Sequence, residues 1–152
     1  MWYDGTAIDA ARFYAEDLSR TARWARSTAR PATIPDGKQG DVLTVEFTVI
    51  GIPCIGLNGG PQFKHSEAFS FQVAHGRPGR NRPPVERDRR ERRPGAQCGW
   101  CKDKWGLSWQ ITPRALTAAI ADPDRAAAKR VFEAMMTMQK IDIATIEAAR
   151  KG

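Results

Sequence analysis

Two cysteines three residues apart, Cys98 and Cys101, form the most recognisable chemical motif of the sequence. A redox-active dithiol of the thioredoxin type has its first cysteine at the N-terminus of a helix, which stabilises the thiolate. Here the motif runs into a predicted turn and strand instead. A zinc site would need a second pair of ligands, and the third cysteine, Cys54, stands alone. We therefore expect two small, half-buried thiols with a structural role.

Residues that could bind a metal or transfer protons are sparse. The sequence contains two histidines, His65 and His75, and neither belongs to a recognisable His/carboxylate triad. The run Asn58-Gly59-Gly60 follows a predicted strand and allows two interpretations. Its glycines could let backbone N–H groups face a ligand, or they could simply form the turn.

Hydrophobic periodicity predicts the elements that position these residues. Apolar residues at helical spacing predict a helix near 6–17. Alternating or short apolar runs predict strands at 43–49, 52–57, 69–73 and 106–112.

The C-terminal region is predicted to be helical. Asp122 is a suitable N-cap with Pro123 at the first helical position. Val131, Met135 and Met138 then form an apolar stripe, which is typical of core or dimer packing rather than a cofactor site. A last short helix is predicted to open near Ile141.

Composition limits the class of protein. The chain has 152 residues, which suits one domain, and its 41% apolar and 27% charged residues argue against global disorder or a membrane protein. Without an apolar run of membrane-spanning length or a leader, we expect a cytoplasmic protein that contacts no membrane.

The net charge of +7 comes from two windows, residues 18–35 and 75–96. Twelve of the seventeen arginines lie there, so the rest of the chain carries a small net negative charge. The windows could be arms that bind phosphate backbones, or solvated and disordered loops. A third interpretation is a shifted reading frame, because Arg, Pro, Gly and Ala dominate when a GC-rich gene is translated out of frame.

Codons for residues 75–96 can be chosen so that reading on from the second base gives TDDQAETDRLWNAIVGNGGQE. This string has an acidic start and apolar residues at helical spacing, as an amphipathic helix has. Codons for residues 18–35 can likewise be chosen so that reading on from the third base gives FPDSAVGAVHRAPGDYP, which has a strand-like middle. We therefore favour two compensated frameshifts, and the basic charge then indicates no nucleic-acid partner.

Four blocks of the sequence resemble one family: WYDGTAIDAARFY, GIPCIGLNGGPQFKHSEAFSFQV, QCGWCKDKWGLSWQITP and AMMTMQKIDIATIEAA. They look like the PhnB-like, 3-demethylubiquinone-9 3-methyltransferase-like proteins of the vicinal-oxygen-chelate (glyoxalase/bleomycin-resistance) superfamily. The resemblance covers about three quarters of the chain and fails in the two basic windows, where the recovered strings match the family.

The resemblance implies an α+β fold of paired βαβββ modules whose sheets curl around a pocket, usually in a homodimer. We expect a single domain with a first module at 1–60, a second module at 61–113 and a helical tail at 114–152.

The resemblance also suggests where a ligand would lie. In superfamily members that use a metal, the last strand usually supplies a Glu shortly after an Asp-x-x-Gly turn. Here the turn is Asp103 to Gly106, and the matching position carries Gln110, while Gln72 lies in the second module's first strand. Neutral amides are weak ligands for Zn²⁺ or Fe²⁺, so we expect no metal and no other cofactor.

We expect the pocket to be lined by Asn58, Gln72, Trp109 and Gln110. Strand alternation puts Trp109 and Gln110 on opposite faces, so only one of the two can face a ligand. The superfamily position favours Gln110.

These features favour a protein that binds a small organic molecule, and they leave open whether it is an enzyme. The alternatives are a metal-dependent lyase, isomerase or oxygenase, the methyltransferase of the family label, and nucleic-acid binding through the arginine-rich windows. A Rossmann-type methyltransferase places a Gly-rich turn after its first strand, and the sequence has no such turn.

The coding DNA tests the frameshift hypothesis. We predict that reading it in the shifted frame across residues 18–35 and 75–96 restores the two structured strings, because the flanking blocks are already in the family's frame. Codons that do not reopen those frames would rule the hypothesis out.

Overall fold

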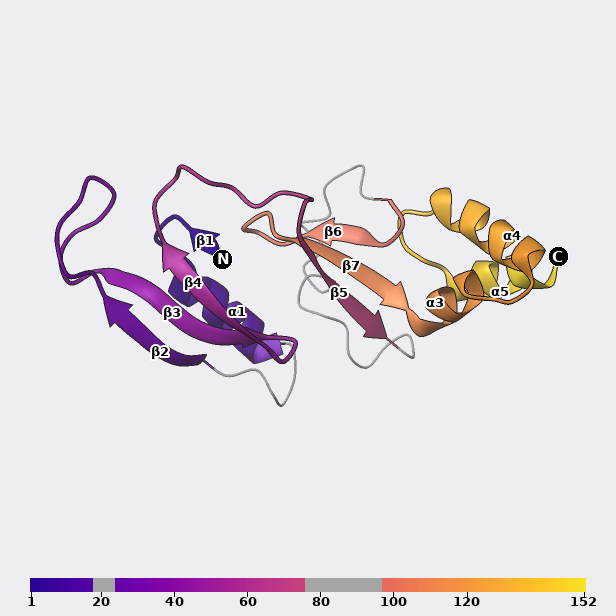
Figure 1. Ribbon diagram of the computed structural model, residues 1–152, viewed down its shortest axis with the longest axis horizontal. Coiled ribbons are helices and arrows are strands. Elements are labelled where there is room, and N and C mark those ends of the chain that lie inside the picture. Colours follow the sequence, from indigo (N-terminus) through magenta and orange to yellow (C-terminus); the bar gives the residue numbers. More distant parts are fainter. Residues whose placement is uncertain (18–23, 76–96) are drawn as a thin grey trace. The chain divides into compact units, whose positions relative to one another are not determined.

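The computed structural model describes residues 1–17, 24–75 and 97–152, and the chain divides into two compact units (Figure 1). The first unit is Met1–Ser66 and the second is Glu67–Gly152. The boundary lies six residues beyond the one expected between the modules, and the helical tail belongs to the second unit. The predicted helix at 6–17 and the four predicted strands are confirmed to within two residues at each end.

The first unit is one βαβββ module. Its elements are β1 (Trp2–Tyr3), α1 (Ala7–Asp17), β2 (Trp24–Ala29), β3 (Val42–Val49) and β4 (Ile52–Asn58). The strands form one sheet in the order β1-β4-β3-β2, with β1 parallel to β4 and the other neighbours antiparallel.

Helix α1 covers one face of this sheet. Tyr14 of α1 is fully buried and stacks on Phe47 of β3, with ring centroids 5.8 Å apart. A methyl group added at Gly56 of β4 would lie 3.2 Å from the Cβ of Ala7, so helix and strand approach closely there. Glu46 and Ile55, in register on the other face, are exposed.

The second unit repeats part of this order. It contains β5 (Ser70–His75), β6 (Trp100–Lys102) and β7 (Ser108–Pro113), in the order β5-β7-β6. β5 is parallel to β7, and β6 is antiparallel to it, as β1, β4 and β3 are related in the first unit. The paired-module α+β fold is therefore confirmed for these strands. The helix recovered for residues 75–96 falls almost entirely outside the described residues.

Three helices follow the second sheet: α3 (Arg114–Ile120), α4 (Arg125–Met136) and α5 (Ile143–Lys151). They enclose a small core made by Leu116, Ala119, Val131, Ile141 and Ile146, against which Met135 and Met138 pack. The apolar stripe predicted from the sequence thus faces this core.

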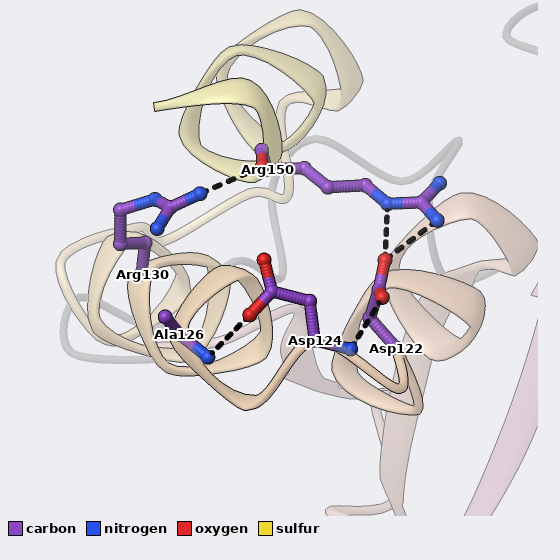
Figure 2. Close-up of polar contacts among 5 residues, drawn as sticks. All are labelled: Asp122, Asp124, Ala126, Arg130 and Arg150. Carbon is purple, nitrogen blue, oxygen red and sulfur yellow. Dashed lines mark hydrogen bonds and ion pairs between the residues drawn. The ribbon is translucent and has the colours of Figure 1, made fainter.

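The predicted N-cap at Asp122 is wrong, because α4 begins three residues later. Asp124 is the N-cap, and its side chain accepts a hydrogen bond from the backbone N–H of Ala126 (Figure 2). The Asp122 carboxylate is already engaged by the backbone N–H of Asp124 at 3.0 Å and by the Arg150 guanidinium at 2.6 Å. It therefore joins the α3–α4 turn to α5.

Part of the first basic window is folded into the first unit. Residues Trp24–Ala29 form β2, and Arg30 is buried. The Arg30 guanidinium donates to the carbonyl oxygen of Asn58 at 2.7 Å. The interpretation of this window as a disordered loop is wrong for residues 24–30, while residues 26–29 of the strand are exposed to solvent. Residues 18–23 of this window and 76–96 of the second lie outside the described residues, and the frameshift stays a prediction.

Among the described helices, none combines the length and the apolar character needed to cross a membrane.

The helical tail should lose stability in acid. The backbone N–H of Asp124 and then Arg150 lower the pKa of Asp122, and the backbone N–H and hydroxyl of Thr145 lower that of Asp142. A carboxyl group whose pKa is lower in the folded chain stabilises the fold above its unfolded pKa of about 3.9, and this contribution disappears as the pH falls through the folded pKa.

We predict that D122N and D142N each flatten the loss of stability between about pH 6 and about pH 3 in urea unfolding. The control is E147Q, since Glu147 is an exposed carboxylate of α5 for which the described structure records no hydrogen bond or ion pair. If the free energy of unfolding fell equally steeply with decreasing pH in the wild type and in both aspartate variants, Asp122 and Asp142 would not be the cause of the acid sensitivity.

Candidate functional site

Polar side chains gather on one face of the second sheet. Gln72 of β5 is in register with Gln110 of β7, and Gln110 is in register with Trp100 of β6. Residues in register on neighbouring strands point to the same face, so these three side chains form one row across the sheet. We call this row the amide row. On the same face, the neighbouring row contains Ser70, Ser108 and Lys102, and Thr112 follows Gln110 along β7.

Hydrogen bonds between the strands hold both amides. The Gln110 side-chain nitrogen donates to Ser70 Oγ at 2.8 Å, and the Gln72 nitrogen donates to Thr112 Oγ1 at 3.2 Å. Within the described ranges, the structure records no hydrogen bond to either amide oxygen. Two orientated acceptors therefore lie in one row with the indole of Trp100, and Gln110 is the direct neighbour of Trp100.

Ser108 adds a buried polar group to this face. Its side chain is fully buried, and its Oγ has no hydrogen-bond partner among the described residues. A buried hydroxyl without a partner costs about 1–3 kcal/mol, so native structures rarely leave one unpaired. Burial of the polar side chains therefore increases across this face, from the exposed Gln72 to the half-buried Gln110 and the buried Ser108.

The charge on this face is compensated. The Lys102 ammonium forms an ion pair with Glu67 at 2.5 Å, and the lysine side chain is only 21% exposed. The remaining side chains of the two rows are neutral amides, hydroxyls and one indole. The arrangement suits neutral polar groups better than an anion.

The opposite face of the sheet is apolar. Trp109 is fully buried, and its ring lies 5.3 Å from that of Phe71, its neighbour in register on β5. The alternation of Trp109 and Gln110 is therefore present as expected, and the structure brings Gln72 and Gln110 together without Trp109.

The carboxylate of Asp103 organises the turn between β6 and β7. One oxygen accepts from the backbone N–H groups of Trp105 and Leu107, at 3.0 and 3.1 Å, and the other accepts from the Trp109 indole at 3.0 Å. Asp103 is 5% exposed, so these bonds are shielded from water. Gly106 has φ 82°, a conformation that favours glycine, and its N–H donates to the Asp103 carbonyl oxygen. The turn thereby fixes the register that places Trp100 opposite Gln110.

Asn58 lies in the first unit and holds its elements together. Its side-chain oxygen accepts from the N–H of Ala7 at the start of α1, at 3.0 Å, and its nitrogen donates to the Val42 carbonyl at 2.9 Å. Gly59 packs so closely on the Trp2 indole that a methyl group there would lie 2.3 Å from the ring. This geometry gives the Asn-Gly-Gly run a structural role, and its contact with a ligand stays a prediction.

The three cysteines are free thiols. Cys98 lies in a turn with φ 56°, and Cys101 lies in β6, so Cys98 does not occupy the helix N-terminus that a thioredoxin-type dithiol requires. Burial raises the pKa of the Cys54 thiol, which keeps it protonated and weakly nucleophilic.

The described residues contain neither a cluster of metal-ligating side chains nor the sheet of a Rossmann-type methyltransferase. They include no group of three or more His, Cys, Asp or Glu side chains arranged around a possible metal ion. β1 connects to α1 through Asp4, Gly5 and Thr6, and each described sheet has one parallel strand pair flanked by an antiparallel strand. This is not the doubly wound parallel sheet whose Gly-rich turn holds S-adenosylmethionine in Rossmann-type methyltransferases.

Five residues of this face were missing from the residues predicted for the pocket: Ser70, Trp100, Lys102, Ser108 and Thr112. Their signal was the pairing of β6 with β7, since the Asp-x-x-Gly turn implies a hairpin that places Trp100 near Gln110. The exact partner depends on turn geometry, which alternation alone does not give.

Comparison with known proteins identifies the family of this chain. The family model described as 3-demethylubiquinone-9 3-methyltransferase matches residues 1–112. The chain belongs to this family.

A solved structure titled "Putative 3-demethylubiquinone-9 3-methyltransferase, PhnB protein, from Bacillus cereus" resembles this member of the family. The TM-score is 0.56, with 23% sequence identity, over 74% of this chain and 95% of that chain. At this identity the likeness shows the shared fold. No curated protein matches the sequence.

The buried hydrogen bond between Asp103 and Trp109 should contribute more to the free energy of unfolding than the exposed hydrogen bonds of the surface do. We predict that D103N destabilises the chain by about 1–3 kcal/mol, because an amide can no longer accept from both backbone N–H groups and the indole. In a W109F background the same change should cost less, since the indole donor is already gone. Urea unfolding of the four proteins gives the coupling energy of this double-mutant cycle.

A coupling energy near zero would mean that Asp103 and Trp109 act independently, against this assignment.

Proposed function

We propose that this family member binds a small, neutral organic molecule on the polar face of its second sheet. The observation that carries the proposal is the amide row, in which Gln72, Gln110 and Trp100 come from three different strands and share one face. Binding sites for small molecules commonly combine an aromatic surface with a few orientated polar groups.

The chemistry of the row selects the ligand class. A planar ring can stack on the Trp100 indole, and a hydroxyl or amide group on it can donate to the side-chain oxygens of Gln72 and Gln110. The buried hydroxyl of Ser108 offers a further partner deeper on the same face. With Lys102 already paired to Glu67, an anionic ligand would bring a charge that no other described side chain of the two rows compensates.

The proposal does not include a chemical reaction. The superfamily's metal-dependent lyases, isomerases and oxygenases use ligands of a kind that the described residues do not gather in one place. Stoichiometric Zn, Mn or Fe in the purified full chain would favour that alternative over simple binding.

Two probes of equal shape test the preference for a neutral ligand. We predict that 4-hydroxybenzamide binds with a Kd of about 1 mM, which is typical for a compound of its size. The anion 4-hydroxybenzoate should bind roughly tenfold more weakly, because its carboxylate loses water without gaining a cation. Titration of the full chain, followed by Trp fluorescence and calorimetry, measures both constants.

The variant Q110A should weaken 4-hydroxybenzamide binding roughly tenfold. It removes one acceptor for the ligand together with the hydrogen bond to Ser70 that orientates this acceptor. Q62A is the matched control, since Gln62 is an exposed glutamine of the first unit. Equal binding of both probes, or an unchanged Kd in Q110A, would refute the proposed site.

A further inference from the structure

The helical tail contacts the candidate site through the connection between α4 and α5. The family match ends at residue 112, so α3, α4 and α5 lie beyond it. Figure 1 shows the α4–α5 connection running beside the start of β6. We infer that residues 138–141 of this connection, here called the clamp, are positioning residues that hold Trp100 and Gln110 in the amide row. This inference rests on the proposed function.

The clamp binds the backbone immediately before Trp100. The Met138 carbonyl accepts from the N–H of Cys98 at 2.8 Å, and the Gln139 carbonyl accepts from the N–H of Gly99 at 2.9 Å. The Gly99 carbonyl in turn accepts from the N–H of Ile111 at 2.8 Å. One turn therefore links the clamp to both strands of the row, one residue before Trp100 and one after Gln110.

The packing at Gly99 leaves no room for a side chain between the turn, β7 and the clamp. A methyl group at Gly99 would lie 2.7 Å from the Ile111 carbonyl oxygen and 3.2 Å from Cγ1 of Ile141. Gly99 is buried and has φ 79°, a conformation that favours glycine. Ile141 is 7% exposed and belongs to the core of the tail, so the clamp is anchored in the helices.

Hydrogen bonds and an ion pair also hold the C-terminal end of the helical tail in place. Arg150 of α5 pairs with Asp122 before α4, and Arg130 of α4 donates to the carbonyl oxygen of Arg150 at 2.9 Å (Figure 2). Arg130 also donates to the carbonyl oxygen of Ala149 at 3.0 Å. These bonds join the C-terminal end of α5 to α4 and to the α3–α4 turn. These contacts hold the three helices together, and the clamp connects two of them.

Two alanine variants separate positioning from plain destabilisation. I141A removes the side chain that packs near Gly99, whereas L116A removes a side chain of the same core that is 3% exposed and remote in sequence from the clamp. Both should lower the urea midpoint of the full chain, because each opens a cavity in that core. The milder I141V keeps the branched side chain and should give intermediate values.

The first readout needs no ligand. In I141A, amide hydrogen exchange at Cys98, Gly99 and Ile111 should be roughly tenfold faster than in L116A, because these N–H groups lose their fixed acceptors. The second readout is the Kd for 4-hydroxybenzamide, which should rise roughly tenfold in I141A and stay near the wild-type value in L116A.

The outcomes distinguish the two proposals. If the wild type does not bind 4-hydroxybenzamide, the proposed function fails, while the exchange data still decide whether the clamp fixes the turn. If the wild type binds and I141A and L116A have equal Kd values and equal exchange rates, the clamp inference is overturned. If I141A does not fold, the same comparison between I141V and L116A decides it, with a smaller expected difference.

Discussion

The buried carboxylate of Asp103 is the constraint on which the second unit depends. Three N–H donors converge on it, two from the backbone of its own turn and one from the Trp109 indole. Such a carboxylate is stable in a buried position only while these donors satisfy it, so turn, register and the orientation of Trp109 are fixed together. The amide row on the other face follows from that register. A single residue thus couples the apolar packing of one face to the polar pattern of the other.

Asn58 has a similar structural role in the first unit, where its buried side chain connects three elements. Its amide joins the start of α1 to β3 and β4, because it can accept and donate at once. Each sheet therefore has one buried polar side chain that ties the ends of its strands together. The Asn-Gly-Gly run that begins at Asn58 and the Asp-x-x-Gly turn that begins at Asp103 therefore both have a structural role in their units.

Much of the fold could be predicted from the sequence, because strand alternation and helical spacing are local signals. Strand alternation predicted that Trp109 and Gln110 lie on opposite faces of the sheet, and the structure confirms this. Register is not local, so the pairing of Trp100 with Gln110 and the unsatisfied Ser108 were missed. The N-cap of α4 was misplaced because Asp122 and Asp124 are both good caps by type, and only the ion pair with Arg150 separates their roles. Arg30 was missed because a basic window gives no sign that one of its arginines is buried.

The central claim is that the face of the amide row, and not the face of Trp109, receives a ligand. Intermolecular nuclear Overhauser effects between 4-hydroxybenzamide and the isotope-labelled full chain test this most directly. We expect contacts from the ring protons of the probe to the Trp100 indole and to the side-chain amide protons of Gln110, with none to Trp109. Contacts to Trp109 and Phe71, with none to Trp100 or Gln110, would contradict it.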